Sequence, residues 1–72
     1  MNIESKKAIV TGAAAGIGRA TAVLLAERGA ADIALVDIDE TGVDETARLV
    51  AAHGTRATVH CLDLADISAT ET

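Results

Sequence analysis

The sequence lacks phenylalanine, tyrosine, tryptophan and proline, and it contains a single cysteine, Cys61. Without aromatic side chains the chain has no platform on which the bases of single-stranded nucleic acid stack. One cysteine forms no internal disulfide, so we expect a reducing, cytoplasmic setting and a buried, small apolar role for Cys61. No apolar run approaches the roughly 20 residues of a membrane span, and no signal-peptide core precedes the first apolar stretch.

The 72 residues carry a formal net charge of −5, which argues against nucleic acid or an anionic membrane as a partner. The charge is unevenly distributed along the chain. Residues 1–31 have four basic side chains against two acidic ones, a net charge of +2, whereas residues 32–72 have two against nine, a net charge of −7. The apolar half of the composition is mainly alanine, valine, isoleucine and leucine, which suits buried parallel strands.

Three apolar runs, at 6–11, 32–38 and 56–62, predict β-strands, and the run at 32–38 is nearly continuous, as in a strand buried on both faces. We expect helices over 16–28 and 41–53. Arg28–Gly29 and His53–Gly54 provide helix ends, and Thr41 is the expected cap of the second helix. The apolar face expected for the first helix consists of Ile17, Ala20, Thr21, Leu24 and Leu25.

The order β-α-β-α-β, with crossovers of this length, predicts parallel strands joined in the right-handed sense. Both helices then lie on one face of the sheet, and nothing in the sequence covers the other. We therefore predict the α/β class and a Rossmann-like, mononucleotide-binding half of a doubly wound domain, incomplete within residues 1–72. The rest of this single domain, or other chains, would cover the open face.

The stretch between the first strand and the first helix carries three glycines, Gly12, Gly16 and Gly18, in the pattern G-x-x-x-G-x-G. Gly12 allows a sharp turn off the strand, Gly16 allows backbone to approach a pyrophosphate, and Gly18 allows the helix to pack close to the sheet. The N-terminus of the helix supplies unpaired N–H groups and a partial positive charge. The stretch therefore predicts a phosphate-binding turn.

A second candidate is Asp37, at the end of the second strand and 19 residues after Gly18. An acid at this spacing is placed to accept hydrogen bonds from both hydroxyls of an adenosine ribose. A 2′-phosphate there would meet like charge, so Asp37 predicts NAD rather than NADP. After the third strand, Asp63 is placed to accept from an adenine amino group and Leu64 to cover the ring.

The run from Thr11 to Gly18, T-G-A-A-A-G-I-G, resembles the T-G-x-x-x-G-x-G signature of the short-chain dehydrogenase/reductase family. Asp37 and the pair Asp63–Leu64 are similar to that family's ribose-contacting acid and adenine-contacting pair. The resemblance implies hydride transfer between a nicotinamide cofactor and a small alcohol or carbonyl, in an enzyme that is often a homo-oligomer. It also implies a set of cofactor-binding residues: Gly12, Ala14, Ala15, Gly16, Ile17, Gly18, Asp37, Ile38, Asp63 and Leu64.

The sequence differs from the family pattern in the residues that carry out catalysis. The family's catalytic serine, tyrosine and lysine have no counterpart: the chain contains no tyrosine, its one asparagine is Asn2, and Lys6 and Lys7 precede the signature. We assign no catalytic residue and no metal ligand, and we expect His60 to be a half-buried structural histidine. The parent protein is expected to be an enzyme, and this chain its cofactor-binding segment.

Two other interpretations stay open. The first is a dinucleotide-binding module without catalysis, which a literal reading of 72 residues favours. The second is a methyltransferase-like α/β domain, which also has a glycine-rich turn after its first strand. Such turns usually follow E/D-x-G-x-G-x-G, whereas Gly12 here is preceded by Val10 and Thr11 and has no glycine two residues later.

Overall fold

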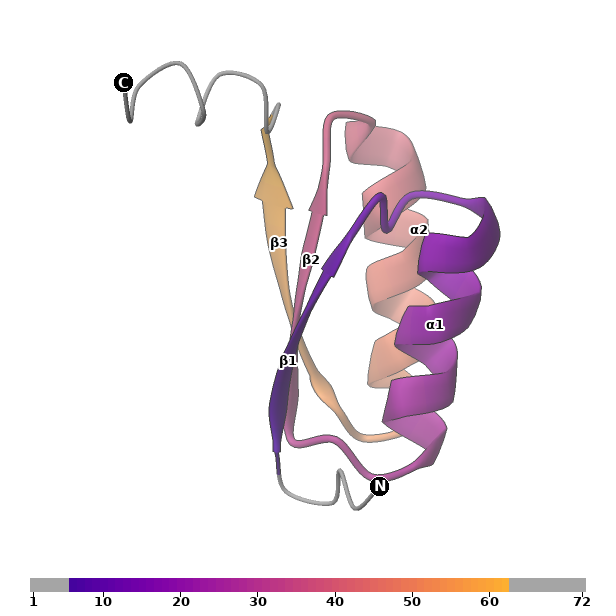
Figure 1. Cartoon of the computed structure of the whole chain (residues 1–72), viewed down its shortest axis with the longest axis vertical. Helices are drawn as coiled ribbons and strands as arrows, with labels where there is room; N and C mark the ends of the chain where they lie inside the picture. The colour runs from indigo at the N-terminus through magenta and orange to yellow at the C-terminus, as the bar shows by residue number, and fades with distance from the viewer. Residues whose placement is uncertain (1–5, 63–72) are drawn as a thin grey trace.

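The computed structural model describes residues 6–62, which form a three-stranded sheet and two helices. Chain order is β1 (Lys7–Thr11), α1 (Gly16–Glu27), β2 (Asp32–Asp37), α2 (Glu40–Ala51) and β3 (Arg56–Cys61). The strands are parallel, with β2 between β1 and β3 (Figure 1). The predicted order of elements and the Rossmann-like fold class are confirmed, and each strand agrees with its prediction to within one residue.

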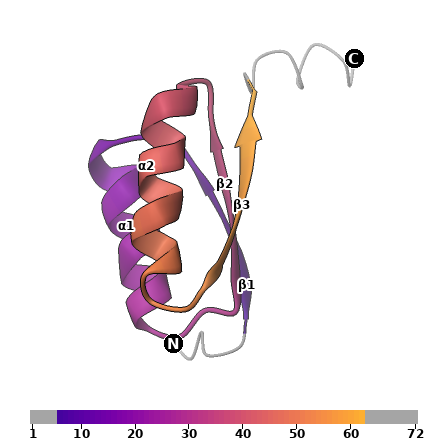
Figure 2. The ribbon, with the colours of Figure 1, turned by 180° about the vertical axis from the view of Figure 1, so that it is seen from behind.

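Both helices pack against the same face of the sheet, as Figures 1 and 2 show from opposite sides. In β1, Val10 faces the helices and is buried, whereas Ile9 faces away and is 75% exposed. Because side chains alternate along a strand, Ile33 and Leu35 of β2 also face the helices and are fully buried, whereas Ala57 and Val59 of β3 are partly buried against the core. The largest fully buried side chains, which form the centre of the core, are Ile33, Leu35, Val43, Val50 and Thr46.

The apolar face predicted for α1 is wrong. Ile17 and Leu24 are 86% and 49% exposed, and Ala22 and Ala26 are the buried residues of this helix. Alanine allows the helix axis to approach the sheet closely. Ile17, Thr21 and Leu25 lie along the flank of α1 beside β1, and Leu25 is partly buried against the core.

The start of α2 also differs from the prediction. The helix begins at Glu40 and its N-cap is Asp39, not Thr41. An Asp39 side-chain oxygen accepts a hydrogen bond from the backbone N–H of Gly42 at 3.1 Å, the third residue of the helix. Asp39 also gives the helix N-terminus a negative charge, which the helix dipole favours.

Two residues of β3 are more exposed than expected. Cys61 is exposed, with its Sγ atom 3.4 Å from the carbonyl oxygen of Ile38, and His60 is exposed on the face of the sheet away from the helices. Within residues 6–62, no helix covers that face, which leaves His60 exposed. Cys61 is the next residue of the strand, so its side chain points to the opposite face, and it lies at the end of β3. Among residues 6–62, no helix has the length and apolarity needed to cross a membrane.

Candidate functional site

The turn between β1 and α1 requires glycine at two positions. Gly12 has φ +64° and Gly16 has φ +59°, which are left-handed conformations that other residues adopt at a cost of roughly 1–2 kcal/mol. A Cβ atom at either position would meet nothing within 4 Å. The backbone conformation therefore favours glycine at both positions, and the space beside them is open to a ligand.

Gly18 is required for a different reason. A Cβ atom there would lie 1.9 Å from the carbonyl oxygen of Gly12, far inside van der Waals contact. The first turn of α1 therefore packs directly against the backbone that leaves β1. We predicted that Gly18 would allow the helix to pack close to the sheet; the close contact is instead with the backbone of the turn at Gly12 and Ala13.

The N-terminus of α1 is open to an anion. Its N-cap, Ala15, provides no side-chain hydrogen bond, and the first turn contains no acid. By contrast, α2 has both a side-chain cap, Asp39, and an acid in its first turn, Glu40. The first N–H groups of α1 and its positive dipole end are therefore available to a phosphate or similar anion.

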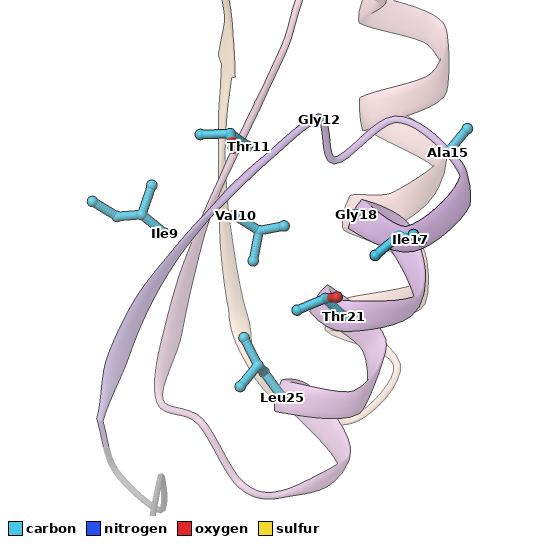
Figure 3. Close-up of a pocket in the computed structure, with 9 residues that line it drawn as sticks. All are labelled: Ile9, Val10, Thr11, Gly12, Ala15, Ile17, Gly18, Thr21 and Leu25. Carbon is cyan, nitrogen blue, oxygen red and sulfur yellow. The ribbon is translucent and has the colours of Figure 1, made fainter.

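An open groove of about 570 Å³ begins at this turn and continues between β1 and α1 (Figure 3). In the close-up, Val10 points toward α1, whereas Ile9 points away from it. The exposed side chain of Ile17 provides apolar surface at the upper end of the groove. The lining residues are Ile9, Val10, Thr11, Gly12, Ala15, Ile17, Gly18, Thr21 and Leu25.

Asp37 ends β2 beside the same turn, outside the lining of the groove. Its Oδ1 accepts from the N–H of Asp39 at 2.9 Å, and its Oδ2 accepts from the N–H of Ala14 at 3.0 Å. The bonds from Asp39 and Ala14 hold the pKa of the Asp37 carboxyl below its usual value of 3.8, although partial burial acts in the opposite direction. The side chain is thus a carboxylate at neutral pH, and each oxygen keeps a lone pair for a further donor.

The other predicted site residues fall into three groups. Ala14 is buried, and its N–H is already bonded to Asp37, whereas Ala15 is exposed at the start of α1. Ile38 is 67% exposed directly after Asp37 and offers apolar surface beside the carboxylate. The remaining two predicted residues, Asp63 and Leu64, lie outside the described residues.

The family model for short chain dehydrogenases matches residues 6–72, almost the whole chain. The chain belongs to the short-chain dehydrogenase family. The resemblance in the T-G-A-A-A-G-I-G run is thereby confirmed, and the methyltransferase-like interpretation is set aside.

Two curated relatives show how much of a family member this chain represents. It is 48% identical over 62 residues to the probable oxidoreductase EphD of Mycobacterium tuberculosis, covering 86% of this chain and 10% of that protein. It is 43% identical over 63 residues to chanoclavine-I dehydrogenase easD of Claviceps purpurea, covering 88% and 24%. The chain thus spans about a tenth to a quarter of the length of these relatives.

Solved structures of the family share the fold. A short chain dehydrogenase from Mycobacterium paratuberculosis bound to NAD superposes with a TM-score of 0.86 at 35% identity, covering 96% of this chain and 30% of that one. Carveol dehydrogenase from Mycobacterium avium in complex with NAD gives a TM-score of 0.86 at 34% identity, covering 94% and 28%. Both of these neighbours were solved with NAD.

Three residues of this short-chain dehydrogenase segment contact the turn, and the sequence did not predict these contacts. Arg19 donates to the carbonyl of Ala14, Thr46 donates to the carbonyl of Ala13, and Gly42 lies against Ala14. Thr46 had a detectable signal, because it falls in the buried stripe of α2 between Val43 and Val50. Arg19 directly follows the glycine pattern, but nothing in the sequence identifies its partners.

The described residues bring together two kinds of group that suit the binding of a ligand. They combine open N–H groups at the α1 N-terminus with a carboxylate, Asp37, at the end of the neighbouring strand. Within residues 6–62, no group of three or more His, Cys, Asp or Glu side chains is placed to hold a metal ion.

Proposed function

We propose that this chain is the NAD-binding N-terminal segment of a short-chain oxidoreductase. The observation that carries the proposal is the hydrogen bond from the Ala14 N–H to Asp37. It brings a ribose-binding acid and a phosphate-binding turn into one site. The open space at Gly16 and the uncapped N-terminus of α1 support a pyrophosphate there.

In this proposal, different residues at the carboxyl ends of the strands contact different parts of the cofactor. The stretch from Gly12 to Gly18, with Ala14, Ala15 and Ile17, would hold or line the pyrophosphate. Asp37 would accept from the ribose hydroxyls, Ile38 would pack against the adenosine, and Asp63 and Leu64 would bind the adenine. Asp37 is an ionised carboxylate at neutral pH, and the bonds from Asp39 and Ala14 lower its pKa further, so a 2′-phosphate would face a negative charge. This favours NAD over NADP.

In the whole protein, bound NAD exchanges a hydride with a small alcohol or carbonyl. The 72 residues contain no tyrosine, so the family's tyrosine-based proton transfer would use residues outside this chain. The role of this segment is to bind and orient the dinucleotide. Assembly into a homo-oligomer, which the family membership suggests, is a further prediction that light scattering tests.

The test is a calorimetric titration of the 72-residue chain with NAD, NADP and ADP, after circular dichroism has shown that the chain is folded. We expect NAD and ADP to bind and NADP to bind more weakly. Absence of heat with all three nucleotides from a folded chain would overturn the proposal. Equal affinity for NAD and NADP would overturn the assignment of Asp37.

A non-catalytic dinucleotide-binding module is the second candidate, favoured by the absence of tyrosine. Titration does not separate it from the first, because both bind NAD. A longer chain that includes the residues after Thr72 separates them. Reduction of NAD by secondary alcohols, followed at the absorbance band of the reduced nicotinamide, is expected for the oxidoreductase and not for the module.

A further inference from the structure

The side chain of Arg19 connects three segments that are far apart in the sequence. Its Nη2 donates to the carbonyl oxygens of Ala14 at 2.6 Å and of Gly42 at 3.0 Å, and its Nε donates to Thr46 Oγ1 at 2.9 Å. A guanidinium presents five N–H donors in a rigid plane, so one side chain reaches all three acceptors. Arg19 thereby joins α1, the turn and α2.

Thr46 completes this network from inside the core. Its side chain is fully buried, and its hydroxyl donates to the carbonyl oxygen of Ala13 at 2.6 Å. A hydroxyl has one proton and two acceptor lone pairs, so Thr46 donates to Ala13 while it accepts from Arg19. The carbonyl groups of Ala13 and Ala14 are therefore both held on the inner side of the turn.

The N–H groups of the same two residues are fixed as well. Ala13 donates to the carbonyl of Val36 at 3.2 Å, and Ala14 donates to Asp37 Oδ2 at 3.0 Å. All four backbone polar groups of Ala13 and Ala14 thus have protein partners. The first free N–H groups after them belong to the N-terminus of α1, where the proposed pyrophosphate lies.

The start of α2 connects this hydrogen-bond network to Asp37, the acid proposed to bind the ribose. Gly42 accepts from Arg19 and lies so close to Ala14 that a Cβ atom on it would be 2.7 Å from the Ala14 Cβ. Asp39, the cap of α2, donates its N–H to Asp37. The turn and the acid are therefore connected both directly and through α2.

We propose that Arg19 and Thr46 are positioning residues for the dinucleotide, a role that rests on the proposed function. They hold the carbonyls of the turn inward, so that the N–H groups at the α1 N-terminus face the pyrophosphate at a fixed distance from Asp37. Neither residue touches the ligand. A site fixed in this way loses less conformational entropy when the ligand binds.

Arg19→Lys is the first test, because it keeps the positive charge and removes the planar set of donors. We expect the Kd for ADP and NAD to rise about tenfold, with the Kd for adenosine, which has no phosphate, changing less than about twofold. Arg28→Lys, at the other end of the same helix, is the matched control and should bind all three as the wild type does. An unchanged Kd for ADP in Arg19→Lys would overturn the proposal, because charge alone would then suffice.

Thr46→Val and Thr46→Ser form the second test. Valine keeps the shape of the side chain and removes the hydroxyl, so Thr46→Val should weaken the binding of ADP about tenfold. Serine retains the hydroxyl, so the affinity of Thr46→Ser for ADP should be within about threefold of that of the wild type. Thr41→Val, exposed on the same helix, is the control. Affinities are compared per folded chain, with the folded fraction taken from circular dichroism. Equal affinities for Thr46→Val and Thr46→Ser would overturn the assignment of Thr46.

A measurement without ligand separates this inference from the proposed function. Hydrogen exchange of the Ala14 amide, which is bonded to Asp37, should quicken about tenfold in Arg19→Lys relative to amides of β2. Unchanged exchange would overturn the positioning role even where the wild type binds NAD. Failure of the wild-type chain to bind ADP or NAD would instead overturn the proposed function, and this inference with it.

Discussion

Asp37 accepts a hydrogen bond from the backbone N–H of Ala14 at 3.0 Å, across 23 residues of sequence. The bond joins the end of β2 to the turn that follows β1. It brings together the acid proposed for the ribose and the turn proposed for the pyrophosphate. A change in the carboxylate is therefore expected to alter both the cofactor preference and the stability of the turn.

Asp37→Ala tests the cofactor preference. The substitution removes a charged acceptor from the ribose hydroxyls and the repulsion of a 2′-phosphate, so we expect NAD to bind at least about tenfold more weakly while NADP changes little. Calorimetric titration of both nucleotides measures the ratio. Asp44→Ala removes an exposed acid from α2 and serves as the control. A preference for NAD that survives unchanged in Asp37→Ala would contradict the ribose assignment.

The pH dependence of stability tests the same carboxylate in the absence of ligand. The backbone N–H groups of Asp39 and Ala14 lower the pKa of Asp37 below 3.8 in the folded chain. The stabilisation is therefore complete above about pH 5 and is lost as the pH falls through the folded-state pKa.

Urea unfolding of the wild type and Asp37→Asn at several pH values between 7 and about 3 measures this effect. The difference between their free energies of unfolding should be constant near neutral pH and should narrow below 3.8. Other acids titrate equally in both proteins, so the comparison isolates Asp37. If the difference in free energy of unfolding stays constant over the whole pH range, the pKa of Asp37 is the same in the folded and the unfolded chain, which would contradict the prediction.

Two glycines of the turn are expected to respond differently to substitution. Gly18→Ala places a methyl group 1.9 Å from the Gly12 carbonyl oxygen, so it should destabilise the fold by more than about 3 kcal/mol. Gly16→Ala meets no atom within 4 Å and should cost only the roughly 1–2 kcal/mol of its left-handed backbone. Urea unfolding compares the two, and equal losses would contradict the close packing at Gly18.

Gly16→Val tests the ligand side of the same turn. The branched side chain would occupy the open space proposed for the pyrophosphate, so binding of ADP and NAD should be abolished. Gly16→Ala is the matched control for backbone strain and should retain measurable binding. Affinities are compared among folded chains, and a Gly16→Val chain that binds ADP as tightly as the wild type would place the pyrophosphate elsewhere.

The sequence predicted the strands well because each is a short stretch rich in apolar and β-branched residues and bounded by turn residues, and β2 is nearly continuous in apolar residues. It predicted the position of the phosphate-binding turn because the glycines required by its backbone are visible as a pattern. It failed for the face of α1 because that helix is apolar on two sides. Periodicity does not show that Ala22 and Ala26, rather than Ile17 and Leu24, would face the sheet.

The contacts of Arg19, Gly42 and Thr46 could not be predicted from the sequence for another reason. They join segments as far as 33 residues apart, and such pairs leave no periodic signal along the chain. The exposure of two β3 residues also went beyond the prediction. His60 lies on the face that the helices within residues 6–62 do not cover, and Cys61 lies at the end of β3.

Gly42→Ala provides a test in which steric contact and helix propensity predict opposite results. Within a helix, replacing glycine with alanine ordinarily stabilises by roughly 0.5–1 kcal/mol. Here the new methyl group would lie 2.7 Å from the Ala14 Cβ and 3.0 Å from its carbonyl oxygen, so α2 must move away from the turn. We expect a net loss of about 1–3 kcal/mol in the free energy of unfolding, together with weaker binding of ADP.

Asp44→Ala, exposed in the same helix, is the control that reports helix propensity alone and should leave stability equal or slightly higher. Urea unfolding and calorimetric titration of both variants make the comparison. Stabilisation by Gly42→Ala with unchanged ADP affinity would show that α2 does not press against the turn. Loss of stability and affinity together would show that the start of α2 supports the phosphate-binding turn through Ala14.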